Sequence, residues 1–334
     1  MTWTVHPIAD FARFAAVWDR VNEAGRGIPF LHSAFIALAL REFGTGDELL
    51  AVHGAGGAGD ALAVVFAKGK GVWETFQPAQ LPLGAWVMGP GLDYRRLLDE
   101  LLRCLPGAAL LIGVSQQDPY LHERPADSGE LETLDYVQTA WVQVQGDFES
   151  YWAARGKNLQ QNMRRQRAKL DAESLGTELE AITELDRVGE AIEDYGRLES
   201  AGWKAEEGTA VHPDNAQGRF YRSMLEDFCR RGTGRIYRYR IGGKLAAMDL
   251  CVEGRGVQVV LKTAYDESNR QLSPASLMRQ ESFRQIFTSG GLERVEFYGR
   301  LMEWHTRWTD KTRTLFHVNI YRSGALRWLR ERLA

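Results

Sequence analysis

The stretch Val257–Phe287, VQVVLKTAYDESNRQLSPASLMRQESFRQIF, decides the fold because it predicts a strand, a polar loop and a helix in direct succession. Val257–Tyr265 is rich in β-branched and aromatic residues, as in a buried strand, and polar Asp266–Leu272 cannot continue it. Ser273 precedes Pro274, the pattern of an N-cap followed by proline at the first helical position. Such a helix start can hold a pyrophosphate with its free N–H groups, although an ordinary capped helix explains the same residues.

Length and composition describe a globular protein of two domains. The chain has 334 residues, too many for one ordinary core, and 44% of them are hydrophobic and 25% charged. The net charge of −3 argues against nucleic acid as a partner, and the three cysteines lack metal-ligand or disulfide-framework spacing, so we expect no metal. We find no signal-peptide pattern and no apolar run of about 20 residues, which predicts a cytoplasmic protein without membrane insertion. The oligomeric state stays open.

The order of predicted elements is similar in the two halves of the chain. Each half contains roughly one strand, two helices, three strands, a helix and another strand. We therefore expect an α/β (α+β) fold of two units, each a mixed, mostly antiparallel sheet flanked by helices. The expected domains are residues 1–146 and 147–334, with a linking helix over 148–173. The glycine-rich run at 53–60 opens no helix, which favours a hairpin connection over a phosphate loop.

The linking helix is basic. It is interrupted at Gly156 and has no acidic residue between Ser150 and Leu170. Its cations include Lys157, Arg164, Arg165, Arg167 and Lys169. They form either a solvated face or an anion-facing surface for a phosphorylated cofactor or acidic substrate. The cluster is too short to indicate RNA or DNA binding.

Several segments of the second half resemble one family, in the family's own order. They are Leu198–Lys204 followed by Gly208 and Thr209, then Leu245–Leu250, Lys262–Asp266, Ser273-Pro274, Glu296–Gly299 and Trp308. Together they resemble the GNAT superfamily, in particular the BioF2-like and cellulose-biosynthesis CelD-like acetyltransferases, over about 148–321. The first half is similar only in architecture, as in tandem GNAT proteins and, more distantly, Fem-type aminoacyl transferases.

The resemblance implies that acetyl-CoA, or another acyl-CoA, binds after the fourth strand of the second unit. A backbone N–H near Leu261–Thr263 would contact the thioester carbonyl, and residues 269–276 would cradle the pyrophosphate. The implied cofactor-binding residues are Leu261, Lys262, Thr263, Asn269, Arg270, Ser273, Ala275 and Ser276. This chain departs from the usual Arg/Gln-x-x-Gly-x-Gly/Ala signature, because Ser273 and Ala275 stand at the glycine positions. Glycine there would let the backbone approach a phosphate more closely.

Acyl transfer needs a polarised carbonyl and a deprotonated nucleophile, and three residues are candidates for the proton chemistry. Asp249, inside an apolar strand, would either point into a cleft or lie solvated on a half-exposed face. Glu199, at a helix end, is a candidate catalytic residue or an exposed helix carboxylate. Tyr265 would donate a proton to the leaving thiolate, a role tyrosine often has in this fold, or is a buried strand tyrosine.

Five further residues are candidates for binding the acceptor. Trp203 would wall the acceptor site or close a core edge, and Lys204 would bind an anionic acceptor or a CoA phosphate. Asp266 would face the acceptor or cap the loop. Trp304 and His305 form a polar-aromatic cluster near the end of the chain, where the family pattern would have a lysine. His305 is also a candidate base, although a lone histidine is more often structural.

Three functions are compatible with these patterns. The first is transfer of an acetyl or other acyl group to an amine or hydroxyl of a small-molecule or saccharide, cell-envelope acceptor. The second is Fem-like aminoacyl transfer from a charged tRNA, which would favour a strongly basic groove. The third is a catalytically degenerate GNAT protein that binds a ligand or partner.

Overall fold

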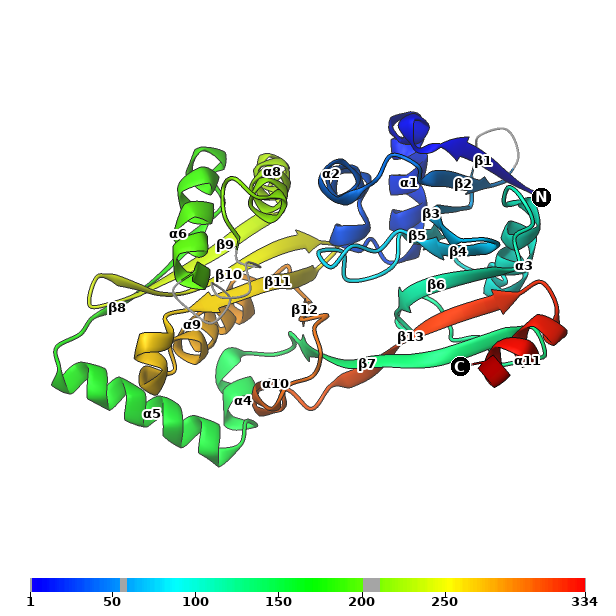
Figure 1. Ribbon diagram of the computed structural model, residues 1–334. Helices are drawn as coiled ribbons and strands as arrows, with labels where there is room; N and C mark the ends of the chain where they lie inside the picture. The colour runs from blue at the N-terminus through cyan, green and yellow to red at the C-terminus, as the bar shows by residue number, and fades with distance from the viewer. Residues whose placement is uncertain (1, 55–58, 201–210, 334) are drawn as a thin grey trace. The chain divides into compact units, whose positions relative to one another are not determined.

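The chain forms two compact units in a computed structural model that describes residues 2–54, 59–200 and 211–333 (Figure 1). The first unit comprises Met1–Thr139 and Arg313–Ala334, and the second comprises Ala140–Thr312. Both are mixed sheets flanked by helices, so the predicted fold class is confirmed. The units differ from the expected ranges in two respects. The second unit begins at Ala140 and not at residue 147, and residues 313–334 belong with the first unit, because their strand pairs with a strand of that unit.

The first unit has a mixed sheet with helices α1 and α3 against it, and α2 packs on α1. Its elements are β1 (Trp3–Pro7), η1 (Ile8–Asp10), α1 (Phe11–Gly25), η2 (Pro29–Leu31), α2 (Ser33–Phe43), β2 (Leu49–His53), β3 (Ala61–Gly69), β4 (Val72–Thr75), β5 (Trp86–Met88), α3 (Tyr94–Cys104), β6 (Leu111–Gln117), β7 (Leu131–Gln143), β13 (Thr312–Tyr321) and α11 (Gly324–Leu333). Its strand order is β1-β2-β3-β4-β6-β13-β7, with β5 beside β3. Since β2 and β3 pair antiparallel from His53 and Ala61, the predicted hairpin connection at 53–60 is confirmed.

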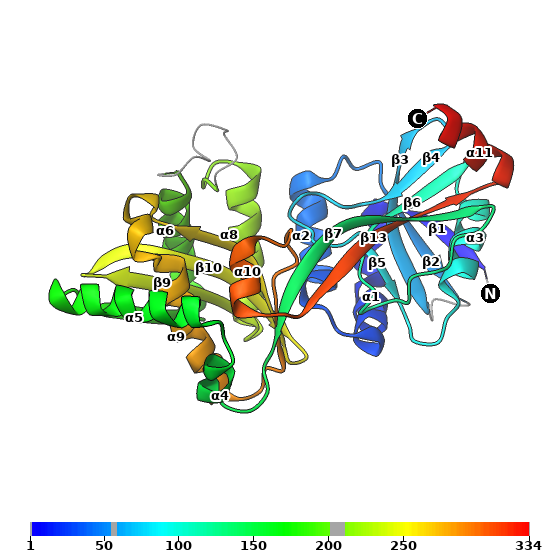
Figure 2. The ribbon, with the colours of Figure 1, turned by 90° about the horizontal axis from the view of Figure 1, so that it is seen from below.

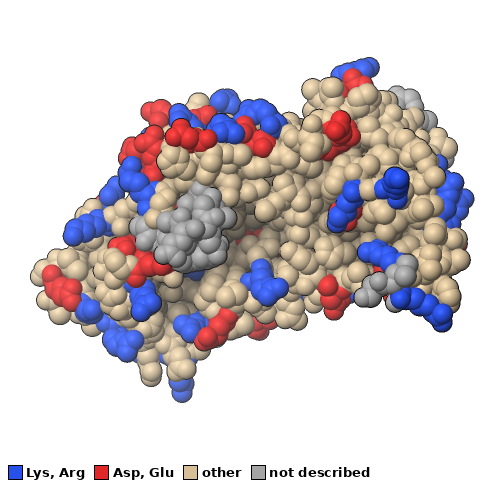
Figure 3. Space-filling model, viewed as in Figure 1, with Lys and Arg blue, Asp and Glu red and all other residues tan. Residues whose placement is uncertain are grey.

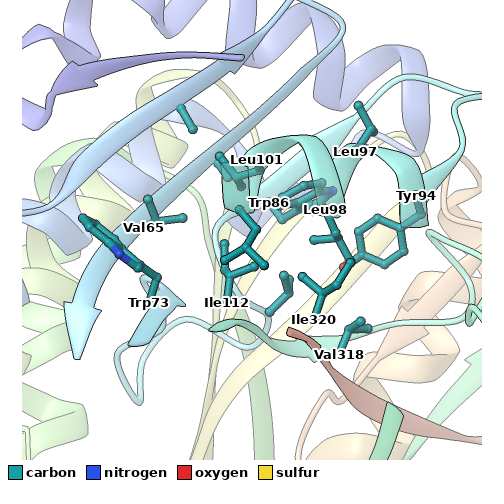
Figure 4. Packing of buried hydrophobic residues seen from close by; sticks show 14 of the residues in the cluster. Val65, Trp73, Trp86, Tyr94, Leu97, Leu98, Leu101, Ile112, Val318 and Ile320 are labelled. Atoms are coloured by element: carbon teal, nitrogen blue, oxygen red, sulfur yellow. The ribbon is translucent and has the colours of Figure 1, made fainter. Parts of the chain in front are cut away.

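Helix α3 closes the core of this unit (Figure 4). Its apolar residues recur at helical spacing, and Leu97, Leu98 and Leu101 are buried against strand residues such as Ile112. Burying one leucine side chain contributes about 1.5–3 kcal/mol, so this face of α3 is a main source of the unit's stability. The helix begins at a true cap, because the Asp93 carboxylate accepts the Arg96 N–H at 3.1 Å.

The second unit is a sheet with helices on both faces. Its elements are α4 (Phe148–Ala153), α5 (Lys157–Ala172), β8 (Thr177–Ile182), η3 (Leu185–Arg187), α6 (Val188–Ser200), α8 (Ala216–Arg230), β9 (Gly234–Ile241), β10 (Lys244–Gly254), β11 (Val257–Tyr265), η4 (Glu267–Leu272), α9 (Pro274–Ser289), β12 (Arg294–Glu296) and α10 (Glu303–Trp308). The strand order is β8-β9-β10-β11-β12, followed by the end of β7. The pairs are antiparallel except β11 with β12.

Helices α6 and α8 cover one face of this sheet, and α9 covers the other with α5 alongside it (Figures 1 and 2). Helix α5 is held to α9 by the Arg167 guanidinium, which donates to Gln280 Oε1 and Glu281 Oε1 at 3.0 Å each. The predicted linking helix is thus two helices, α4 and α5, and the expected interruption at Gly156 is confirmed. None of the described helices combines the length and apolar character of a membrane span.

Candidate active site

Strands β11 and β12 run parallel and then separate. Their pairing joins Val257–Val259 to Arg294–Glu296, where β12 ends, whereas β11 continues to Tyr265. From Val260 onward, this side of β11 therefore has no β12 partner. Its backbone N–H and C=O groups are left for a different partner, because strand groups away from water need hydrogen bonds.

A β-bulge lies at the point of separation. On the other side of β11, Lys262 pairs with Leu250 and Val260 pairs with Cys251, so Leu261 is the extra residue. Bulges bend a strand and re-aim its groups, and they are over-represented next to active sites. The bulge falls within Leu261–Thr263, the segment expected to contact a thioester carbonyl.

The separated strands border a cavity of about 500 Å3. Its walls come from β11, the start of α9, the segment after β12 and α10. The lining residues are Val260, Leu261, Lys262, Thr263, Tyr265, Arg270, Ser273, Pro274, Ala275, Ser276, Arg279, Phe297, Gly299, Met302, Trp304 and His305. The fold thus gathers all the expected cofactor residues except Asn269, together with Tyr265, Trp304 and His305, around one cavity.

Helix α9 begins at this cavity without a side-chain cap. Ser273 occupies the predicted N-cap position, but its side chain makes no capping hydrogen bond; its hydroxyl lies 3.5 Å from the Asn162 amide of α5. The reason is its left-handed backbone, with φ of 53°, a conformation that favours glycine. At the first glycine position of the signature, serine therefore adopts a backbone conformation that glycine adopts more readily. With no acid in the first turn of α9, the partial positive charge of the helix start is uncompensated.

The loop before α9 has two distinct parts. Asp266 caps η4, since its carboxylate accepts the Ser268 N–H at 2.9 Å and the Asn269 amide at 2.6 Å. Burial raises the pKa of Asp266, but these hydrogen bonds outweigh it and lower the pKa below its usual value. Asp266 and Asn269 thus shape the loop and do not line the cavity. Arg270 is exposed, lines the cavity and has no ion-pair partner among the described residues.

Beneath the cavity lies a buried polar cluster. The Asp249 carboxylate accepts the Thr263 hydroxyl at 2.5 Å and lies 3.7 Å from Arg279 Nη2. Both charged side chains are buried, so the expectation of a solvated Asp249 is wrong: β10 is a central strand covered on both faces. Burial raises the pKa of Asp249, against the opposing effects of Arg279 and Thr263. Asp249 does not itself line the cavity.

Comparison with known proteins identifies this part of the chain. Residues 157–321, just under half of the chain, match the family model described as Acetyltransferase (GNAT) domain. This segment is a GNAT-type domain. A search of curated proteins found no match.

Solved structures share the fold of the whole chain. The C-terminal domain (DUF2156) of a protein assigned as a lysylphosphatidylglycerol synthetase, from Agrobacterium fabrum, is 15% identical with a TM-score of 0.60, covering 96% of this chain and 95% of that one. FemX is 9% identical with a TM-score of 0.57, covering 98% and 99%. L-PGS from Bacillus licheniformis is 12% identical with a TM-score of 0.54, covering 93% and 91%. These likenesses show the fold alone and do not distinguish a BioF2-like or CelD-like subgroup.

Glu199 lies in the interior of the GNAT-type domain, so the expectation of an exposed helix carboxylate is wrong. Its Oε1 lies 3.0 Å from Lys262 Nζ, and its Oε2 accepts the Val211 N–H at 2.7 Å. Glu199 is buried because it lies on the face of α6 that packs on β10 and β11. Glu199 does not line the cavity itself, but its partner Lys262 does. Trp203 and Lys204 lie outside the described residues.

Tyr265 stands at the end of β11 and lines the cavity with 40% of its surface exposed. The alternative of a buried strand tyrosine is therefore wrong. Its position follows from the separation of the strands, since β12 ends before it reaches this level. Tyr265 is available to a bound molecule.

His305 is buried and stacks on Trp304, with ring centroids 3.5 Å apart. Its Nδ1 accepts the Met302 N–H at 2.8 Å, which places the proton of a neutral ring on Nε2. Burial and the nearby Arg279 charge lower the pKa of His305 to about 4. At neutral pH His305 is therefore an uncharged hydrogen-bond donor, which disfavours it as a base.

Sequence reasoning missed Arg279. It lies on the buried face of α9 between Ala275 and Phe283, four residues from each, and it lines the cavity. A charged residue in register with apolar residues on a helix signals either a buried ion pair or a ligand contact. That signal was present in the sequence.

Proposed function

We propose that this protein transfers an acetyl or other acyl group from an acyl-CoA to an amine or hydroxyl of a small-molecule or saccharide acceptor. The observation that carries the proposal is a single cavity bordered by an open strand edge and by a helix start without an acid. Acyl-CoA has a polyanionic end that would suit the helix start, an amide-bearing arm that would suit the strand edge, and a thioester.

The residues present fit this cofactor. Arg270, Ser276 and the start of α9 would hold the phosphates through charge and hydrogen bonds. The open edge of β11 from Val260 would bind the amide-bearing arm as a neighbouring strand would. When bound, acyl-CoA supplies the activated acyl group.

Five side chains would take part in the transfer, and one of them would contact the reacting atoms. Tyr265 would contact the reacting atoms and donate a proton to the leaving thiolate. Asp249 and Glu199 act through neighbours and are positioning residues: the first holds Thr263 and Arg279, and the second holds Lys262. Trp304 and His305 would form the wall that faces the acyl group or acceptor.

Calorimetric titration with acetyl-CoA tests the proposal. Micromolar binding, followed by transfer to an amine or hydroxyl acceptor, would support it. Absence of binding by acetyl-CoA and longer acyl-CoAs would overturn it. Binding without transfer across a broad acceptor panel would favour the degenerate, ligand-binding alternative.

Tyr265→Phe separates catalysis from binding. The variant should lower kcat about 100-fold or more, as expected for loss of a general acid, with little change in acyl-CoA affinity. A variant that retains full turnover would remove Tyr265 from the chemistry.

Charge on the described surface favours acyl-CoA over a charged tRNA. On the face drawn in Figure 3, Lys and Arg atoms are interspersed with Asp and Glu atoms. Of the α5 cations, Arg167 is engaged with Glu281 and Lys169 lies 4.0 Å from Glu173. A gel-shift measurement with bulk tRNA at physiological salt checks this point. Tight binding there would favour the aminoacyl-transfer alternative instead.

A further inference from the structure

The Arg279 guanidinium is a buried cation at the wall of the cavity. Only 3% of Arg279 is exposed, and burial lowers its pKa, against the opposing effect of Asp249. Removing a charge from water is costly unless good geometry and hydrogen bonds compensate it. The contacts of this group therefore decide whether it is purely structural.

The protein satisfies few of its donors. A guanidinium carries five N–H groups. Within the described part of the chain, its one hydrogen bond runs from Nη2 to Thr263 Oγ1 at 3.4 Å, and Nε has no partner. The Asp249 carboxylate lies 3.7 Å from Arg279 Nη2, and it accepts its short hydrogen bond from the Thr263 hydroxyl instead. A buried donor without a partner destabilises the fold, so a structural ion pair alone does not account for this arrangement.

Aromatic rings fix the plane of the group without using its donors. The Arg279 Cζ lies 4.3 Å from the Trp304 ring centroid and 5.5 Å from that of Phe297. Stacking of this kind contacts the face of a guanidinium and leaves its in-plane N–H groups free. Neutral His305, stacked on Trp304, adds an uncharged donor at the same wall.

We infer that Arg279 binds a carboxylate carried by one of the two reacting molecules, so that the substrate of this site is an acid. This inference rests on the proposed acyl transfer and names its substrate class. A planar carboxylate matches the fork of a guanidinium bidentately. The phosphates have a separate place at the helix start, since Arg279 lies five residues beyond Pro274, roughly 7.5 Å along the helix. The carboxylate belongs either to a dicarboxylic acyl group or to an acceptor such as an amino or hydroxy acid.

Two matched binding comparisons test the inference by calorimetry. The first compares succinyl-CoA with butyryl-CoA, which has an uncharged four-carbon acyl group. The second compares α-amino acids with their amides. If the acyl group carries the carboxylate, the first pair should differ about 10-fold or more; if the acceptor does, the second pair should. Arg279→Gln should abolish the difference, and Arg284→Gln, which changes an exposed arginine of the same helix, should leave it intact.

Folding of the variants is controlled separately. Arg279→Gln leaves Asp249 buried without its cation, so the double variant with Asp249→Asn, which removes both charges, is measured beside it. Equal binding within both pairs in the wild-type protein, or a preference that survives in the folded double variant, would overturn the inference. If no CoA thioester binds at all, the proposed function fails, but the acid–amide comparison still decides the role of Arg279.

Discussion

Helix α3 of the first unit and helix α9 of the second follow similar runs of strands and begin in opposite ways. At the start of α3 the Asp93 carboxylate accepts the Arg96 N–H, so an acid already occupies the place where an anion would bind. At the start of α9, Ser273 makes no side-chain cap and the first turn has no acid. Of these two helix starts, the second therefore has no acid that would repel a phosphate.

The buried faces of the two helices differ in the same sense. The buried residues of α3 are Tyr94 and leucines, which contribute packing. Those of α9 include the polar residues Arg279, Gln280 and Ser282. Buried polar groups lower stability unless they are hydrogen-bonded. The buried face of α9 therefore contributes less apolar packing at these positions than that of α3. The first helix stabilises its unit by packing, whereas the polar residues of the second are consistent with the ligand site that we propose.

The largest effect is expected for Leu98→Ala in α3. Leu98 is fully buried, so truncation should lower the free energy of unfolding by about 3 kcal/mol through lost burial and a cavity. Urea unfolding measures this effect. Acyl-CoA affinity at conditions where the variant is folded should not change. A parallel loss of affinity would show that the first unit takes part in binding.

The next effect is expected for Ala275→Asp in the first turn of α9. This variant gives α9 the acid that α3 has, and repulsion of phosphate should weaken acyl-CoA binding about 100-fold. Ala275→Asn is the matched uncharged control and should lose much less. Similar losses for both variants would mean that shape, not charge, governs this position.

Paired arginine variants compare the two helix starts directly. Arg270 and Arg95 are both exposed and have no ion-pair partner among the described residues. Arg270→Gln should weaken acyl-CoA binding about 10-fold, by loss of one charge-assisted contact, and reduce its salt dependence. Arg95→Gln should leave titrations at low and physiological salt unchanged. Equal losses would contradict the assignment of binding to the second unit.

The smallest effect concerns acid stability. The fold lowers the pKa of His305 to about 4, from about 6.5 in the unfolded chain. The stability that comes from keeping this ring neutral is therefore fully present above pH 6.5 and is lost as the pH falls toward 4. Between pH 6.5 and 5.5 this loss is about 1 kcal/mol. His305→Gln should remove that part of the pH dependence of urea unfolding. In the first unit burial also lowers the pKa of His122 to about 4, so His122→Gln is the corresponding test there. An unchanged pH profile for both variants would contradict these burial effects.

Much of the site could be predicted from sequence because its signals are local. The β-branched run, the polar loop and Ser273-Pro274 lie within one short stretch, and each has its own physical meaning. They placed the strand, the helix start and the residues around the cavity. The interruption at Gly156 was visible for the same reason.

The remaining features depend on contacts between distant residues. Glu199 is buried because α6 turns it toward Lys262, more than 60 positions along the chain. The left-handed backbone of Ser273 is set by the turn between η4 and α9, and serine is not a residue that signals it. Residues 313–334 join the first unit through pairing of β13 with β6, a register that spacing in the sequence cannot reveal.

The pairing of β13 with β6 affects the order in which the two units can fold. Strand β13 lies between β6 and β7 in the first unit, yet it follows the whole of Ala140–Thr312 along the chain. A ribosome working from the N-terminus completes the second unit before β13 is made. The half that is synthesised first is therefore the half that finishes folding last, and until then β6 and β7 lack the strand that joins them.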